Sequence, residues 1–224
     1  MSVHGPITTV IFDFDGVLAD TERLHLRAFQ QVFSTRGWTL AEDVYFGRYL
    51  GYDDEGLIAA FDVDQQLGLA RADLDALAAD KERIFAGYLE AGEVLFPGAK
   101  VCVENLAKHF RLGIASGALK AEIASILTAA NLLRYFPVIV SAEDVTACKP
   151  APEPYLTAAG LLGVHPGACV AIEDSPPGLQ AARTAGMKTV GVTTTAPRHM
   201  LSADVVIDRL EEFTPRLVTS LTTA

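Results

Sequence analysis

The strongest constraint on the fold comes from residues 9–22, TVIFDFDGVLADTE, close to the start of the chain. Residues 9–12 are apolar and form a short run, as expected of a strand that is buried on both faces of a parallel sheet. Asp13 and Asp15 come next and lead into Gly16, and a helix-start signal follows. The stretch therefore predicts a buried strand whose carboxyl end opens onto a pocket.

The two carboxylates of this stretch need a compensating charge. Burial of Asp13 and Asp15 is costly unless a cation neutralises them or one of them keeps a proton. Mg²⁺ prefers oxygen ligands and is commonly held by one or two carboxylates together with a substrate phosphate. A carboxylate that faces a metal-bound phosphorus can also act as a nucleophile and form an aspartyl-phosphate. The simpler alternative is that both acids only cap the following turn.

Composition limits the partners that the chain can have. Half of its 224 residues are hydrophobic, which is enough for a sizeable core. The formal net charge of −10 disfavours a nucleic-acid backbone as ligand, because such binding needs clustered Lys and Arg. An anionic substrate would therefore depend on a local metal ion and a few cationic side chains.

Cysteine usage and hydropathy indicate a cytoplasmic protein. Cys102, Cys148 and Cys169 lack metal-ligand spacing and are interpreted as reduced thiols. The sequence contains no apolar run of membrane-spanning length, and residues 1–7 lack the basic start and long apolar segment of a signal peptide. We therefore expect neither a membrane partner nor secretion.

The first part of the chain after the acids is predicted to be helical. Apolar residues recur at helical spacing over residues 22–36, and Gly37 ends this segment. Two further helices are expected at 55–61 and 73–89, with breaks at Gly47, Gly51 and Gly68. No buried strand is evident in this region, so residues 22–92 are predicted to form a small all-helical cap domain inserted into an α/β core.

The remaining sequence alternates between strands and helices. Strands are expected at 112–115, 137–140, 168–172, 189–192 and 205–207, and helices at 101–109, 123–130, from 153 onward and at 179–185. Residues from Thr214 onward are interpreted as a polar fringe. The pattern predicts a doubly wound parallel sheet, with a core domain of residues 1–21 and 93–224.

Polar residues follow several of these predicted strands. Ser116 and Gly117 can offer a hydroxyl and free backbone N–H groups to an oxyanion. Lys149 stands between Cys148 and Pro150, and a lone lysine of this kind is usually solvated. Glu173 and Asp174 follow a buried strand and would complete a magnesium site, although an N-cap role for Asp174 or Ser175 is an alternative. Ligands bind at the carboxyl ends of parallel strands, so these groups are expected to converge.

The whole pattern resembles the haloacid dehalogenase superfamily, in its phosphatase and phosphomutase branch. The string from Asp13 to Glu22 matches the first motif of that family, and the later motifs match in order through the chain. The resemblance implies a Mg²⁺-dependent phosphatase with Asp13 as nucleophile and Asp15 as general acid/base. It further implies phosphate-binding roles for Ser116, Gly117 and Lys149, and metal-binding roles for Asp13, the backbone carbonyl of Asp15, Glu173 (directly or through another ligand) and Asp174. Cys148 is a departure, because the family more often has Gly before this Lys.

The resemblance also suggests substrate-contacting residues in the cap. Sugar-phosphate members keep a Thr and a His that position the acid/base, which would correspond to Thr21 and His25 here. A cap loop around Gly51 would select the substrate. β-Phosphoglucomutases have a Lys before this glycine and an Arg three residues after it, whereas this chain has Leu50 and Asp54. A second phosphate would be held poorly without those cations, so a phosphatase is favoured over a mutase.

Other functions are less well supported by the residues. A dehalogenase needs no Mg²⁺, and a phosphonatase would use a cap-loop lysine for a Schiff base, whereas Lys81 is expected inside a helix. A non-enzymatic binding module predicts damaged motif residues, and none is damaged. The expected partner is a small phosphorylated metabolite, such as a sugar phosphate, phosphoglycolate or a nucleotide, and the expected state is a monomer.

Overall fold

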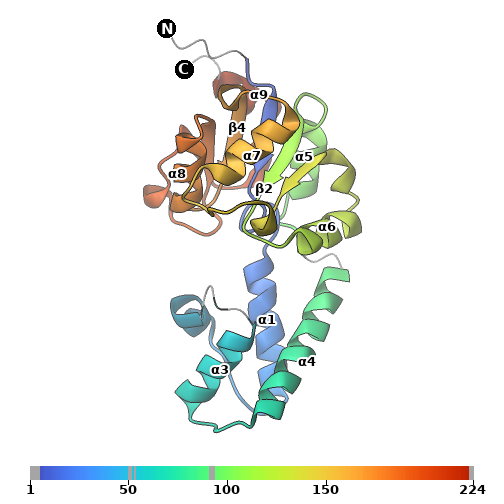
Figure 1. Cartoon of the computed structure of the whole chain (residues 1–224), viewed down its shortest axis with the longest axis vertical. Helices are drawn as coiled ribbons and strands as arrows, with labels where there is room; N and C mark the ends of the chain where they lie inside the picture. The colour runs from blue at the N-terminus through green and yellow to red at the C-terminus, as the bar shows by residue number, and fades with distance from the viewer. Residues whose placement is uncertain (1–5, 50–51, 53, 91–93, 222–224) are drawn as a thin grey trace. The chain divides into compact units, whose positions relative to one another are not determined.

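The computed structural model describes residues 6–49, 52, 54–90 and 94–221 (Figure 1). The chain divides into two compact units. The first, here called the core unit, comprises Met1–Asp20 and Val94–Ala224. The second, here called the cap unit, comprises Thr21–Glu93. Each unit is described separately below.

The core unit contains a six-stranded parallel sheet with strand order β3-β2-β1-β4-β5-β6. The strands are β1 (Thr9–Phe12), β2 (Arg111–Ala115), β3 (Val138–Val140), β4 (Cys169–Glu173), β5 (Lys188–Val192) and β6 (Val205–Ile207). Strand β1 lies in the middle, where Thr9 aligns with Arg111 on one side and Cys169 on the other. The chain therefore winds outward on both sides of β1, and the predicted doubly wound fold is confirmed.

Helices cover both faces of this sheet. The core-unit helices are α5 (Ala99–Leu106), α6 (Lys120–Ala129), α7 (Glu153–Leu162), α8 (Pro176–Thr184) and α9 (Pro215–Ser220), and short 3₁₀ turns are η2 (Leu133–Tyr135), η3 (Ala142–Asp144), η4 (Pro166–Ala168), η5 (Arg198–Met200) and η6 (Leu210–Glu212). Helix α7 packs against β2 and β3, and α8 packs against β4 and β5. Figure 1 shows α7 in front of the strands.

The two faces of the sheet bury different side chains of β1, because successive residues of a strand point to opposite sides. Ile11 belongs to a buried cluster with Tyr155 and Ala158 of α7 and Ala181 of α8. On the other face, the ring of Phe12 packs edge-on against Phe136 and Phe213, with centroid distances of 5.9 and 6.0 Å. All four residues of β1 are buried, as predicted for a central parallel strand.

The C-terminal segment is not the polar fringe that the sequence suggested. Thr214 caps helix α9 by accepting a hydrogen bond from the backbone N–H of Leu217. Val218 and Leu221 are buried, with 0% and 4% of their surface exposed. The prediction was wrong because a helix of this length contains too few turns to show a clear apolar period.

The cap unit is helical in its described part, with α1 (Thr21–Ser34), α2 (Glu42–Val44), the π-helix η1 (Tyr45–Tyr49), α3 (Asp54–Gln65) and α4 (Arg71–Glu90). Helices α1 and α4 lie side by side (Figure 1). Gly37 and Gly68 have positive φ angles of 76° and 67° and follow α1 and α3, as expected of helix-ending glycines. Gly47 was expected to be a break, but it lies inside η1.

Aromatic packing forms the centre of the cap unit. The rings of Phe33 and Phe61 stack with a centroid distance of 4.2 Å, and Trp38 packs against both. Phe29 contacts Phe33 and Tyr45. The unit therefore has a hydrophobic core of its own.

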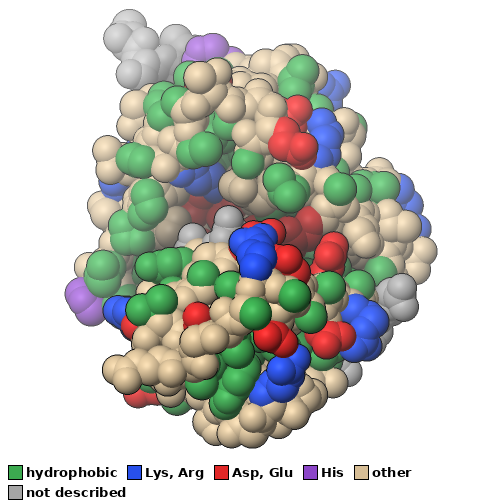
Figure 2. Space-filling model, turned by 60° about the horizontal axis from the view of Figure 1, so that its bottom comes forward, with side chains coloured by type: hydrophobic (Ala, Val, Ile, Leu, Met, Phe, Trp, Pro, Cys, Tyr) green, Lys and Arg blue, Asp and Glu red, His purple; other side chains and the backbone are tan. Residues whose placement is uncertain are grey.

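Ion pairs cover the outside of the cap unit. Arg48 pairs with Asp64, and Arg71 pairs with Glu55 at 3.0 Å and with Asp75 at 2.8 Å. On the face shown in Figure 2, acidic and basic side chains are interspersed with apolar ones. Exposed pairs of this kind contribute little to stability individually. The helices of the described ranges include none with the length and apolar composition of a bilayer-spanning segment.

Substitution of Phe12 tests the importance of the sheet core. We expect Phe12→Ala to reduce the free energy of unfolding by about 3–5 kcal/mol, because it removes a fully buried ring that contacts two other rings. Urea unfolding measures this change. Val101→Ala is the control, since Val101 is 60% exposed and its truncation should change the free energy by no more than about 0.5 kcal/mol. A loss below about 1 kcal/mol for Phe12→Ala would contradict this description of the core.

Candidate active site

The predicted core residues are positioned by the ends of neighbouring strands. Asp13 directly follows β1, and its backbone N–H donates to the carbonyl of Ile172 in β4 at 3.0 Å. Ser116 directly follows β2, and its N–H donates to the carbonyl of Val140 at 2.9 Å. Glu173 is the last residue of β4. Since β2, β1 and β4 are adjacent and parallel, these residues lie along one edge of the sheet.

Lys149 connects the acids of this edge. Its Nζ lies 2.8 Å from Asp13 Oδ1 and 2.6 Å from Glu173 Oε1. Burial lowers the pKa of Lys149, but the charges of Asp13 and Glu173 outweigh this effect and raise the pKa above its ordinary value. The side chain is therefore an ammonium at neutral pH. A cis peptide bond joins Lys149 to Pro150.

Glu173 is surrounded by donors. Its side chain is fully buried, and Oε1 accepts a hydrogen bond from Tyr155 at 2.8 Å as well as from Lys149. Oε2 accepts from the hydroxyl of Ser175 at 2.9 Å. A Cβ on Gly178 would lie 1.9 Å from Glu173 Oε1, so this close approach requires glycine. These contacts fix the carboxylate that holds Lys149.

The N-cap alternative applies to Ser175 and not to Asp174. The Ser175 hydroxyl accepts a hydrogen bond from the N–H of Gly178 at 3.2 Å and so caps α8, which begins with Pro176. The side chain of Asp174 instead joins the cluster of acids. Ligand atoms of Asp13, Glu173 and Asp174 lie within 4.8 Å of one another.

Electrostatics shows that this acidic cluster suits a divalent cation. Burial and the charge of Glu173 raise the pKa of Asp174 to about 7. The same two causes hold the pKa of Asp13 well above its usual range, although Lys149 opposes them. One ammonium faces the three carboxylates of the cluster, so an excess of negative charge remains in a buried place. Oxygen ligands and this excess charge fit Mg²⁺. The carboxylate of Asp15 is not part of the cluster, which is compatible with the predicted use of its backbone carbonyl.

Gly16 makes the turn next to the acids possible. Its φ is +76°, a conformation that favours glycine. A Cβ at this position would lie 1.9 Å from Asp174 Oδ2 and 2.8 Å from Thr195 Oγ1. The Asp174 carboxylate therefore packs directly against the backbone of the turn that follows Asp13 and Asp15.

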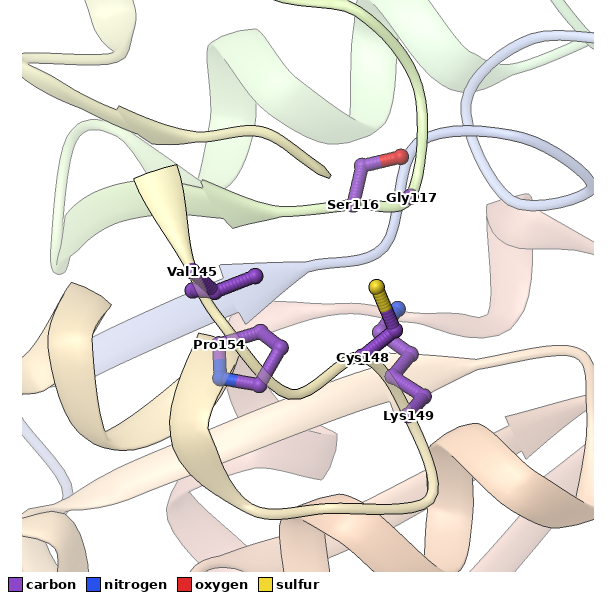
Figure 3. A pocket seen from close by; sticks show the side chains of 6 residues that line it. All are labelled: Ser116, Gly117, Val145, Cys148, Lys149 and Pro154. Atoms are coloured by element: carbon purple, nitrogen blue, oxygen red, sulfur yellow. The ribbon is translucent and has the colours of Figure 1, made fainter. Parts of the chain in front are cut away.

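A cavity of about 160 Å³ lies beside Lys149 (Figure 3). It is lined by Ser116, Gly117, Val145, Cys148, Lys149 and Pro154. Side chains added at Gly117 would meet nothing within 4 Å, and the Ser116 hydroxyl accepts from the N–H of Ala118 at 3.1 Å. The cavity joins a hydroxyl, a glycine backbone and an ammonium, which are suitable groups for an oxyanion.

Several lining and supporting residues were missed from sequence. Val145, Pro154 and Tyr155 showed no pattern that could have indicated a site, because the fold alone brings them there. Cys148 was noted only as a departure from the family pattern. It is exposed and lines the cavity, whereas Cys102 and Cys169 are buried, and all three thiols are free.

The predicted substrate residues Thr21 and His25 lie on α1 of the cap unit, and Gly51 lies outside the described residues. Lys81 Nζ is 2.6 Å from His25 Nδ1 and 2.6 and 2.7 Å from the two carboxylate oxygens of Asp54. Lys81 is only 1% exposed and, as predicted, lies inside helix α4. Its side chain is therefore buried and ion-paired within the cap unit.

His25 is held as a neutral imidazole. Its ring stacks on Phe85 with a centroid distance of 4.1 Å. Burial and the nearby charge of Lys81 lower the pKa of His25 to about 4, although Asp54 opposes them. Since an ammonium can only donate, Nδ1 of His25 accepts from Lys81 and the ring proton resides on Nε2.

Comparisons with known proteins show which proteins the chain is similar to. A family model described as haloacid dehalogenase-like hydrolase matches residues 10–192. SUPPRESSOR OF QUENCHING 1, a chloroplastic protein of Arabidopsis thaliana, is 36% identical over 206 residues, which are 88% of this chain and 19% of that protein. The chain thus spans less than a fifth of the length of this relative.

Other relatives match over most of their length. Fructose-1-phosphate phosphatase YqaB of Escherichia coli is 34% identical over 192 residues, which cover 82% of this chain and 95% of that protein. The β-phosphoglucomutase of Bacillus subtilis is 29% identical over 219 residues, covering 93% and 92%. The solved structure of CbbY from Rhodobacter sphaeroides in complex with phosphate has a TM-score of 0.73 and 27% identity, covering 96% of this chain and 99% of that one.

Alanine substitutions at two glycines with the same φ angle distinguish the cost of backbone strain from the cost of a steric clash at the site. Gly16 and Gly37 both have φ of +76°, but a Cβ on Gly37 would meet nothing within 4 Å. We expect Gly37→Ala to cost about 1–2 kcal/mol of unfolding free energy, the penalty for the left-handed conformation. Gly16→Ala should cost more and should also abolish stabilisation by Mg²⁺, because its methyl group displaces the Asp174 carboxylate. Thermal unfolding with and without Mg²⁺ measures both effects, and an equal response of the two variants would refute the proposed contact.

An NMR titration of the His25 imidazole tests whether this side chain is neutral. We expect the imidazole of His25 to titrate near pH 4 in the folded protein, below the value of 6.5 for an unperturbed histidine. Between these two pH values the unfolded chain binds more protons than the folded protein. The free energy of unfolding therefore decreases as the pH falls from 6.5 to 4. Lys81→Met should raise the pKa, because it removes a nearby positive charge, while burial keeps it below 6.5. Arg83→Met, on the exposed side of α4, is the matched control and should leave the titration unchanged. Titration of wild-type His25 near 6.5 would rule out this environment.

Proposed function

The chain belongs to the haloacid dehalogenase-like hydrolase family, and from this premise we propose that it is a Mg²⁺-dependent phosphomonoester hydrolase. The proposed substrate is a small phosphorylated metabolite, such as a sugar phosphate or a phosphoglycolate-like ester. The observation that supports this most directly is the ammonium of Lys149, which lies between Asp13 and Glu173 and also lines the cavity formed with Ser116 and Gly117.

In the proposed first step, the Asp13 carboxylate attacks the phosphorus in line. A bond forms between the carboxylate oxygen and phosphorus while the bond to the ester oxygen breaks. Asp15, acting as a general acid, gives its proton to the leaving alkoxide, so the alcohol leaves in neutral form. The product of this step is an aspartyl-phosphate on Asp13.

Charge neutralisation comes from several groups. Lys149, the Ser116 hydroxyl and the N–H of Gly117 would stabilise the transferring phosphoryl oxygens. Mg²⁺, when bound, would supply further neutralisation of the negative charge at the site. Asp13, Asp174 and the carbonyl of Asp15 would hold the ion, and Glu173 would ligate it directly or through an intervening group.

In the second step, water attacks the phosphorus of the aspartyl-phosphate. Asp15, now a carboxylate, takes a proton from the water, and the bond between phosphorus and Asp13 breaks. Inorganic phosphate leaves, and Asp13 and Asp15 return to their initial protonation states. Burial and the charge of Glu173 raise the pKa of Asp13, so a bound cation would favour the ionised carboxylate that the first step needs.

A mutase is the second candidate, because a β-phosphoglucomutase is among the relatives. We propose that the cap unit selects the substrate, with Thr21, His25 and Gly51 as contact residues. Mutases of that type have an arginine where this chain has Asp54, and the Asp54 carboxylate is paired with Lys81. A carboxylate at this position would hold a second phosphate poorly, which favours hydrolysis.

Assays of phosphate release test the proposed mechanism. We expect hydrolysis of phosphomonoesters such as fructose 1-phosphate or phosphoglycolate to require Mg²⁺. Asp13→Asn should reduce turnover to the background rate, and Asp15→Asn should reduce it by about 10²–10⁴-fold, because a general acid/base is lost. Asp208→Asn is the control, since Asp208 is an exposed partner of Arg198 and should keep wild-type turnover. Near wild-type turnover of Asp13→Asn would disprove the assignment of the nucleophile.

A parallel assay separates the two candidate functions. The enzyme is incubated with β-glucose 1-phosphate and a bisphosphate primer, and the formation of glucose 6-phosphate is compared with the release of phosphate. We expect release without isomerisation. Isomerisation that outpaces release would instead identify a mutase.

A further inference from the structure

Three consecutive threonines follow β5 and have no role in the proposed mechanism so far. Thr193, Thr194 and Thr195 leave the sheet next to β4, because β5 is the neighbour of β4 in the strand order. They therefore lie at the same edge of the sheet as the acidic cluster. The backbone N–H of Thr193 donates to the carbonyl of Ile207 at 3.1 Å, which attaches the start of the segment to β6.

The three hydroxyls have three different neighbours. Thr193 donates to Asp208 Oδ1 at 3.2 Å, at an exposed place on the β6 side. Thr194 donates to the backbone carbonyl of Gly16. The Thr195 hydroxyl lies with the Asp174 carboxylate against Gly16, and it lowers the pKa of that carboxyl. Two of the three threonines thus contact the predicted metal site, and the third points elsewhere.

The contact of Thr194 holds the turn at Gly16. Gly16 has no side chain, so it can be held in place only through hydrogen bonds of its backbone N–H and carbonyl groups. Its N–H donates to the carbonyl of Ala19 at 2.8 Å, and its carbonyl accepts from Thr194. Both polar groups of Gly16 are therefore bound, and the carbonyl of Asp15, one residue earlier, is fixed in direction with them.

The contact of Thr195 fixes the Asp174 side chain. The Asp174 carboxylate and the Thr195 hydroxyl both pack against Gly16, where an added Cβ would lie 1.9 Å from Asp174 Oδ2 and 2.8 Å from Thr195 Oγ1. Asp174 is 5% exposed, so bulk water has little access to its oxygens. A hydroxyl donor at this place restricts the rotation of the carboxylate.

We propose that Thr194 and Thr195 are positioning residues that preorganise the Asp15–Gly16 turn and the Asp174 carboxylate for a divalent cation. The inference rests on the proposed function, because it assumes that this site holds Mg²⁺. The donor groups that orient metal ligands affect binding strongly, and their removal typically costs about 10–100-fold in metal affinity. The threonines act through Gly16 and Asp174 and do not themselves contact the reacting groups.

Valine and serine provide matched substitutions. Valine has nearly the shape of threonine but cannot donate a hydrogen bond, and serine keeps the hydroxyl. Thr194→Val and Thr195→Val therefore remove one donor each, and Thr195→Ser is the conservative variant that should restore function. Thr193→Val is the internal control, because the hydroxyl of Thr193 contacts Asp208 and not the site.

Isothermal titration of the full chain with MgCl₂ tests the proposal without reference to activity. We expect Thr195→Val to weaken Mg²⁺ binding by about 10–100-fold, with a smaller loss for Thr194→Val. Thr195→Ser and Thr193→Val should bind within about twofold of wild type. Urea unfolding in the absence of metal shows whether each variant is folded, and Thr195→Val should lose no more than about 3 kcal/mol of unfolding free energy, because at most one hydrogen-bond donor to a carboxylate is removed.

The outcomes separate this inference from the proposed function. Wild-type Mg²⁺ affinity in both valine variants overturns the positioning role while the phosphatase proposal stands. Equal weakening in Thr193→Val overturns it too, because the effect would then come from the loop as a whole. If the wild-type chain does not bind Mg²⁺, this inference and the metal dependence of the proposed function fail together.

Discussion

The attraction between one buried ammonium and a group of carboxylates is the interaction on which this structure depends. Lys149 lies between Asp13 and Glu173, and Asp174 adds a further negative charge to the same place. Separation of these charges from water is costly, and only close pairing and hydrogen bonds compensate for it. Tyr155 and Ser175 bind the carboxylate of Glu173, which keeps the ammonium directed at Asp13.

The sheet topology makes this arrangement possible without any long loop. The strands that carry Asp13, Ser116 and Glu173 are neighbours and run in the same direction, so their carboxyl ends supply groups to one place. The site therefore rests on the central strands of the core unit, whose residues are almost all buried. The residual negative charge of the acidic cluster suits a divalent cation, in agreement with the proposed metal dependence.

Much of the fold and part of the site could be predicted from the sequence, because they depend on local patterns. Apolar runs followed by polar residues identified the strands and placed Asp13 and Asp174 at strand ends, whereas Lys149 was singled out because its place between Cys148 and Pro150 resembles a family motif. The supporting groups could not be predicted in this way. Thr194 contacts Gly16 across 178 positions of sequence, and nothing in the threonine run indicates its partner. Tyr155 lies within a helix whose apolar pattern explains it equally well as a core residue. Short elements such as α9 were also not predicted, because their packing is determined by the rest of the fold.

The position of β1 in the sheet has a consequence for biosynthesis. This strand is the first to leave the ribosome, yet its two partners, β2 and β4, begin only at Arg111 and Cys169. The contiguous cap unit between β1 and β2 needs no later part of the chain to form its own hydrophobic core. During translation β1 therefore has no strand partner until β2 has been made. Asp13 can contact Lys149 and Glu173 only after β4 has been made. The candidate site is therefore completed only after Cys169–Glu173 has been made, so a chain that ends before β4 lacks part of it.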